Sequence, residues 1–153
     1  MKYSGENSGK TLSFKLEIGG SPELLKVVRA CISEFGLAYG MSSNEIYDIN
    51  LSVNEICANI MEHDYHWDLE QKIVISVENQ ADGLEIRVRD FAPKKDPSLF
   101  QSRNLEEIEG SGLGIFLVGE LMDEVRYNDG VKNGNEIIMK KNHVSKMENE
   151  YGI

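Results

Sequence analysis

The chain contains a glycine-rich segment of a kind that can receive a phosphate group. Apolar residues follow it directly, from Ile115 to Val118, and predict a helix. Glycines leave backbone amides accessible, and the start of a helix carries a partial positive charge, so such a turn favours an anion. The alternative is a turn that only connects a loop to a helix. A glycine motif alone is weak evidence and does not distinguish the two. The segment consists of Gly110, Ser111, Gly112, Leu113 and Gly114.

Two known nucleotide-binding motifs do not fit this segment. No Gly-Lys-Ser/Thr sequence follows Gly114, so it is not a Walker loop. No predicted strand directly precedes Gly110, as a Rossmann fingerprint requires.

A second pair of residues could assist a metal and a proton transfer. Glu55 and Asn59 are four residues apart in a predicted helix, which places one above the other beside the apolar face. A side-chain carbonyl is a suitable oxygen ligand for Mg²⁺, and a carboxylate one turn earlier could accept a proton from a hydroxyl. For this pair alone, an ordinary polar margin of an amphipathic helix is the favoured interpretation.

Asp90 is the third candidate and comes at the end of an alternating segment, 84–89. A carboxylate there could receive the exocyclic amine of adenine. An acid at a strand end more often caps a turn, so the position alone decides nothing.

The elements that would position these residues follow from hydrophobic periodicity. Ser42 and Glu45 have the spacing of a capping box, which predicts a helix from there to about His63. A polar stretch over 90–109 has no period and predicts a functional loop or lid. Alternation predicts strands over 12–18, 73–77, 84–88, 124–128 and 136–140; two further helices are expected from Pro22 to Gly36 and after Gly114.

These elements predict an α+β two-layer sandwich, with a mainly antiparallel mixed sheet and helices on one face. The apolar side of the 42–63 helix should form core, and its members are Ile46, Ile49, Val53, Ile56 and Ile60. One domain is expected over residues 11–141, with a flexible N-terminus over 1–10 and a flexible tail over 142–153.

Composition excludes several function classes. The 153 residues suit a single domain, and the formal net charge of −10 opposes non-specific binding to nucleic acid or to anionic membranes. There is no signal-peptide pattern and no apolar run near the roughly 20 residues of a membrane span. Cys31 and Cys57 lie among apolar residues and predict free thiols. A cytoplasmic protein is therefore expected.

Taken together, the order of these motifs resembles the GHKL superfamily of ATPases and kinases, which has the Bergerat fold. Segments 54–65 and 112–118, continuing to 121–125, look like motifs of the bacterial anti-sigma-factor serine/threonine kinases. The resemblance covers the chain from about Thr11 to Lys141. The linked motifs are far more specific than any one of them.

The resemblance implies roles for individual residues. Asn59 matches the asparagine that holds Mg²⁺ between the phosphates, and Glu55 matches the acid thought to act as general base. His63 ends the same motif near the phosphates, and Asp90 matches the aspartate that receives the adenine amine. The amides of Gly110, Ser111, Gly112, Leu113 and Gly114 would face the phosphates.

Two residues depart from the family pattern. Ala92 stands where a glycine usually lets the backbone approach the base, and alanine does not adopt a positive φ cheaply. Asn135 stands where a threonine usually helps to hold adenine through water. Both residues are still expected beside the nucleotide, although the changes could affect affinity and turnover.

The resemblance therefore implies an ATP-binding anti-sigma factor with serine/threonine kinase activity, using ATP and Mg²⁺. It would phosphorylate a STAS-type antagonist, sequester a sigma factor and form a homodimer. The alternative is a non-catalytic binding module of the same fold. A sensor histidine kinase ranks last, because no phospho-accepting helical hairpin fits before Thr11. A dedicated metal site at His63, Asp64, His66 and Asp68 is also disfavoured, since that stretch crosses a helix end.

Overall fold

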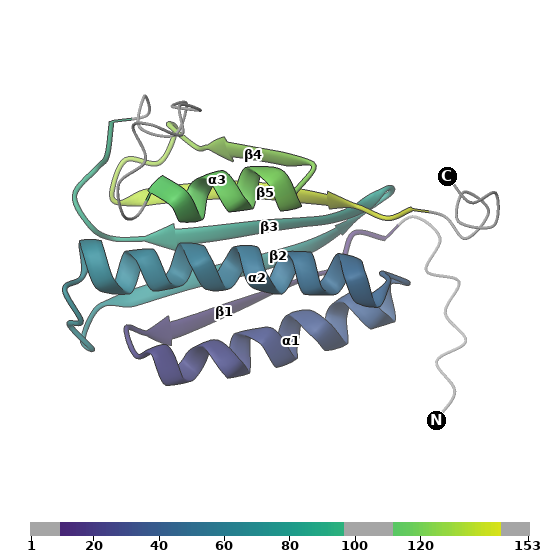
Figure 1. The fold of residues 1–153 in the computed structure, drawn as a ribbon, viewed down its shortest axis with the longest axis horizontal. Helices are drawn as coiled ribbons and strands as arrows, with labels where there is room; N and C mark the ends of the chain where they lie inside the picture. Colours follow the sequence, from purple (N-terminus) through teal and green to yellow (C-terminus); the bar gives the residue numbers. More distant parts are fainter. Residues whose placement is uncertain (1–9, 97–111, 145–153) are drawn as a thin grey trace.

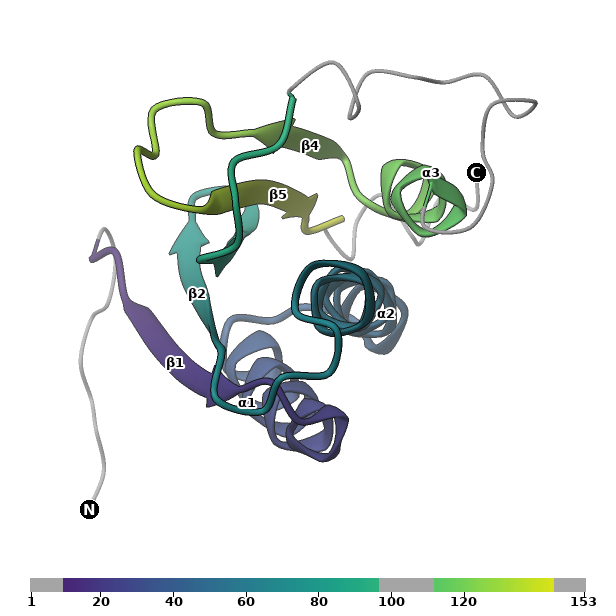
Figure 2. The same cartoon turned by 90° about the vertical axis from the view of Figure 1, so that its left-hand side faces the viewer.

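The computed structural model describes residues 10–96 and 112–144. One five-stranded sheet, in the order β1-β2-β3-β5-β4, carries the helices on one face (Figures 1 and 2). Neighbouring strands are antiparallel at every pairing in the described residues. The α+β fold class is confirmed. The strands are β1 Ser13–Gly19, β2 Lys72–Gln80, β3 Gly83–Asp90, β4 Glu124–Tyr127 and β5 Asn135–Asn142; the α-helices are α1 Leu25–Ala38, α2 Ser43–Asn59 and α3 Gly112–Leu121.

The sheet has one apolar face and one charged face because its strands alternate, as predicted. Ile75 and Val77 of β2 are fully buried beneath the helices and pair with apolar residues of β3. On the opposite face, Arg87 forms ion pairs with Glu85 and Glu136. The core lies between the sheet and the helix layer.

The first helix differs from the prediction at both ends. A short 3₁₀ turn, η1 (Pro22–Leu24), precedes α1, and the predicted stop at Gly36 is wrong, because α1 continues to Ala38. Gly36 is buried, and a Cβ there would lie 2.9 Å from Cγ1 of Ile46. The glycine is therefore used for close packing of α1 on α2 rather than for termination.

Helix α2 begins with the predicted capping box: the Ser42 hydroxyl accepts the Glu45 backbone N–H, and the Glu45 carboxylate accepts that of Ser42. The predicted core residues of this helix are all at most 8% exposed. After Asn59 the chain continues as a π-helical turn, η2 (Ile60–Asp64). This change of pitch falls directly after a predicted site residue, and π turns are frequent at functional sites.

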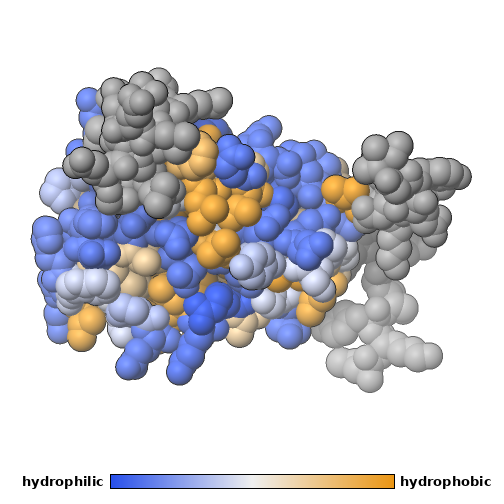
Figure 3. Space-filling view, in the orientation of Figure 1, coloured by the Kyte–Doolittle hydropathy of each residue, from blue (hydrophilic) through white to orange (hydrophobic). Residues whose placement is uncertain are grey.

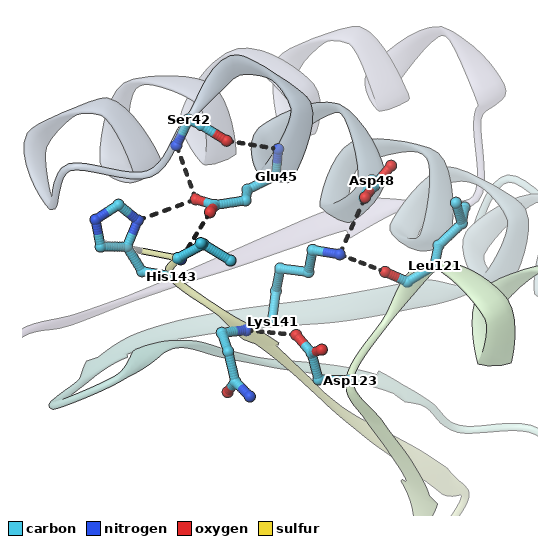
Figure 4. Close-up of polar contacts among 9 residues, drawn as sticks. Ser42, Glu45, Asp48, Leu121, Asp123, Lys141 and His143 are labelled. Carbon is cyan, nitrogen blue, oxygen red and sulfur yellow. Dashed lines mark hydrogen bonds and ion pairs between the residues drawn. The ribbon is translucent and has the colours of Figure 1, made fainter. Parts of the chain in front are cut away.

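The N-terminal end of α2 is held by the last residues of β5 and the chain that follows them (Figure 4). Carboxylate oxygens of Glu45 accept the backbone N–H of Val144 at 2.9 Å and contact Nδ1 of His143 at 3.1 Å. Lys141 donates to the Asp48 carboxylate at 3.0 Å and to the carbonyl oxygen of Leu121 at 2.6 Å. The chain is therefore held against α2 as far as Val144.

The environment of Glu45 keeps its side chain ionised. Burial raises the pKa of Glu45, but hydrogen bonds from the backbone of Val144 and Ser42, together with His143, bring the pKa below its usual value. A carboxyl group whose pKa is depressed by folding stabilises the folded state above the unfolded pKa, about 4.3 for glutamate. This contribution is lost as the pH falls below that value.

Glu45→Gln should lower the free energy of unfolding by about 1–3 kcal/mol at pH 7, because buried donors lose a charged acceptor. The difference between wild type and variant should shrink when unfolding in urea is repeated near pH 3.5. Glu34→Gln on the exposed side of α1 is the matched control and should change little. A difference that stays constant across this pH range would contradict the assigned role of the charge.

Candidate functional site

The predicted site residues come from segments that meet at one end of the molecule. The end of α2, the end of β3 and the start of α3 lie together there (Figure 1, left). Asn59, Asp90 and Asn135 line one pocket, which encloses about 370 Å³ including space open to solvent. Its other lining residues are Lys95 and the apolar Ile56, Ile60, Val88, Ile115 and Ile137. The pocket is thus an apolar slot with a few polar groups, the usual character of a small-molecule site.

The start of α3 approaches α2 so closely that a side chain would not fit between them. A Cβ at Gly114 would lie 2.8 Å from Nδ2 of Asn59 and 3.1 Å from Oε2 of Glu55. The absence of that Cβ brings the first turn of α3 against both polar side chains. The predicted association of Glu55 and Asn59 with the glycine-rich turn is therefore present at Gly114.

Helix α3 also contributes apolar surface on more than one side. Ile115 lines the pocket and Val118 is buried, while Phe116 and Leu117 are half-buried. The space-filling view has an apolar patch over this part of the same face (Figure 3). The side of α3 that carries Ile115 therefore lines the pocket, while the sides that carry Phe116 and Leu117 remain partly exposed.

Asp90 lies at the end of β3 with 4% of its surface exposed. Its Oδ1 accepts the backbone N–H of Ala92 at 3.0 Å and the Asn135 amide at 2.9 Å. Among the described residues, no hydrogen bond ends on Oδ2. Burial raises the pKa of Asp90, as does the nearby Asp64, whereas the bonds from Asn135 and Ala92 and the charge of Lys95 oppose that rise.

Asn135 connects β5 to the segment that follows β3. Its Nδ2 donates to Asp90 and to the carbonyl oxygen of Pro93 at 3.1 Å. Its Oδ1 accepts the backbone N–H of Lys95 at 2.8 Å and the hydroxyl of Tyr127 at 2.7 Å. The side chain that replaces the expected threonine is therefore a hub of the pocket wall.

Ala92 does not strain the backbone, because its conformation is an ordinary one. Among the described non-glycine residues, only His66 and Trp67 have a positive φ, so position 92 does not require glycine. A close approach between backbone segments is found at Gly134, where φ is +80° and a Cβ would lie 2.0 Å from the carbonyl oxygen of Asp90.

Other predicted residues lie away from the pocket or outside the described residues. His63 is not among the lining residues; its side chain is 45% exposed and lies 3.7 Å from Glu62. Ala92 is buried, and its described contact with the site is the hydrogen bond from its backbone N–H to Asp90. Gly110 and Ser111 lie outside the described residues, and Gly112 and Leu113 begin α3.

Sequence reasoning missed three side chains that shape the pocket wall. The Tyr65 hydroxyl donates to the carbonyl oxygen of Lys72 and accepts the backbone N–H of Phe91. Asp64 pairs with Lys95 at 2.7 Å, and Tyr127 bonds Asn135. Asp64 and Tyr65 stand at the end of the recognised motif, so the motif was a signal for them. No spacing rule links Tyr127 to the site.

Comparison with known proteins establishes the family of the chain. Residues 19–141 match the family described as histidine kinase-like ATPase domain. The chain belongs to this family. A serine-protein kinase RsbW from Bacillus subtilis (strain 168) is 28% identical over 120 residues, covering 73% of this chain and 75% of the relative. The protein of the same name from Halalkalibacterium halodurans is 27% identical over 125 residues, 76% of each chain.

A solved structure adds support for the fold alone. The RsbU and RsbW domains of a Mycobacterium tuberculosis protein align with a TM-score of 0.58 at 16% identity, covering 86% of this chain and 32% of that one. The resemblance to kinases of the anti-sigma type, inferred from the motifs, is confirmed. Within the described residues, no helix is long and apolar enough to cross a membrane.

Gly134→Ala should destabilise the protein by roughly 3 kcal/mol or more, because both the backbone conformation and the Asp90 carbonyl oppose a methyl group. Gly40→Ala is the matched control: its φ is +78° but nothing lies within 4 Å of an added Cβ. That variant should cost only about 1–2 kcal/mol, from conformation alone. Urea unfolding of both variants measures the difference, and equal losses would contradict the close approach at Asp90.

Proposed function

We propose that this chain is an ATP-binding anti-sigma factor with serine/threonine kinase activity. The single observation that carries the proposal is the contact of Gly114 with Asn59 and Glu55, beside a pocket that ends at Asp90. The residues of all three motifs therefore lie around the same pocket. Relatives named serine-protein kinase RsbW support the assignment of the reaction.

The lining of the pocket suits an adenine nucleotide. Apolar side chains suit the faces of a base, and the few polar groups beside them can fix its orientation. Oδ2 of Asp90 is available to accept an exocyclic amine. Asn59 offers the oxygen ligand that would hold Mg²⁺, which supplies charge neutralisation at the phosphates. The amides of the glycine-rich turn would hold the phosphates themselves.

Glu55 is the residue we assign to proton transfer. Its Oε2 faces Gly114, one turn before Asn59 on α2. A carboxylate there can orient the hydroxyl of a serine or threonine and accept the proton that it loses. Phosphoryl transfer needs positioning and charge neutralisation more than covalent catalysis, which suits these residues.

The partners follow from the family resemblance. We assign a STAS-type antagonist as the protein substrate and a sigma factor as the sequestered protein, with a homodimer as the assembly. The net charge of −10 supports action through proteins rather than on DNA. A cytoplasmic location is part of the same proposal.

A non-catalytic binding module is the second candidate. The departures at Ala92 and Asn135 were the reason to consider it. The first causes no backbone strain and the second is built into the pocket wall, so both weigh less than the sequence alone suggests. Nucleotide binding without transfer would decide for this candidate.

Gly114→Ala should weaken Mg-ATP binding at least about tenfold, because the added methyl pushes Asn59 and Glu55 out of place. The fold should survive, since the atoms displaced are ends of flexible side chains. Gly119→Ala in the same helix meets nothing within 4 Å and should stabilise α3 by roughly 0.5–1 kcal/mol while leaving binding unchanged. Calorimetric titration and thermal unfolding measure both effects; unaltered binding by Gly114→Ala would contradict the assigned phosphate site.

Glu55→Gln should slow phosphorylation of a STAS-type protein by roughly 100-fold or more, the usual contribution of a general base. Binding of Mg-ATP should remain within about threefold of wild type. Transfer from labelled ATP measures the rate, with Glu62→Gln, an exposed acid on η2, as control. A wild-type rate in Glu55→Gln would exclude this base. Binding without any transfer by the wild type would favour the binding module.

A further inference from the structure

All four hydrogen-bonding positions of the Asn135 side-chain amide are occupied by other groups of the protein. An amide has two N–H donors and two lone pairs on its oxygen. Both donors go to acceptors, on Asp90 and Pro93, and both lone pairs receive donors, from Lys95 and Tyr127. The orientation is therefore fixed, because a flipped amide would set its oxygen against two acceptors and its NH₂ group against the Lys95 N–H. No capacity is left for a direct bond to a ligand.

Asn135 can act on a ligand only through Asp90. Oδ1 of that carboxylate receives two N–H groups, from Asn135 and from the Ala92 backbone. Oδ2 receives none from the described residues. The carboxylate is 4% exposed and lines the pocket, so Oδ2 is the acceptor that the described part of the chain leaves for a ligand.

One free acceptor distinguishes the two purines. Adenine carries an amine donor at position 6, where guanine carries an acceptor oxygen. A carboxylate with both oxygens free can instead receive the N1–H and N2–H donors of guanine side by side. A carboxylate with one oxygen occupied can receive a single amine but cannot make this paired contact.

We propose that Asn135, held in place by Tyr127, is a positioning residue that selects adenine over guanine by occupying Oδ1 of Asp90. This inference rests on the proposed nucleotide site and adds to it the cause of base selectivity. Tyr127 belongs to β4, which pairs with β5 at the edge of the sheet, so the edge strand contributes to specificity without lining the pocket.

The same bond affects the charge of Asp90. Asp64 on η2 raises the pKa of Asp90, Lys95 lowers it, and the hydroxyls of Tyr65 and Tyr127 lie close by. Removal of the Asn135 donor leaves burial less opposed and should raise the pKa further. Loss of ATP binding on acidification should then begin at a higher pH than in the wild type.

The test is titration of the full chain with Mg-ATP and with Mg-GTP across pH 5–8. Asn135→Ala should lower the ratio of ATP to GTP affinity at least about tenfold and move the acid limb of ATP binding to higher pH. Tyr127→Phe should lower the ratio in the same direction by less, because the Lys95 N–H still holds the amide. Asn128→Ala, which loses an amide bonded to Glu136, is the matched control and should keep the wild-type ratio.

Each result bears on the proposal. An equal loss of both affinities in Asn135→Ala, with an unmoved pH profile, would overturn it and leave Asn135 a structural residue. Should Asn135→Ala fail to fold, the ratio in Tyr127→Phe decides in the same way. A wild type that binds neither nucleotide would overturn the proposed function as well, so the two failures are distinguishable.

Discussion

The close packing of α3 on α2 at Gly114 is the constraint on which the site depends. At 100° per residue, Asp48, Ser52, Glu55 and Asn59 fall within about 60° of arc on α2. Helix α3 lies against Glu55 and Asn59 at Gly114, while its Val118 is buried in the core. Its contact with α2 is made possible where it lacks a side chain, at Gly114, and where Lys141 binds Asp48 and Leu121 at the other end. Both ends of α3 are therefore fixed relative to α2.

The sequence predicted the parts of this arrangement that depend on local rules. The capping box at Ser42 and Glu45 and the alternation of the strands are short-range signals, and both are confirmed. The predicted end of α1 was wrong, because the buried contact of Gly36 with Ile46 overrides the tendency of glycine to end a helix. The left-handed conformations of His66 and Trp67 were not predicted, since glycine or asparagine marks such positions more often.

The site was predictable where the family motif covers it and unpredictable where the contacts are distant in sequence. Asn59 and Asp90 were found from their motifs, and they line one pocket. Tyr127 could not be found, because its contact with Asn135 depends on the pairing of β4 with β5. The roles of His63, Gly110 and Ser111 stay predictions from the family pattern.

The departures from the family pattern are better understood as a pair than as separate losses. Ala92 has an ordinary conformation, and Gly134 allows β5 to meet the Asp90 carbonyl. Asn135, the next residue, then bonds the segment after β3 at Pro93 and Lys95, so it holds the chain that Ala92 begins. The rigidity of this wall therefore comes from β5, and a substitution in that strand would disturb Asp90 more than one at position 92.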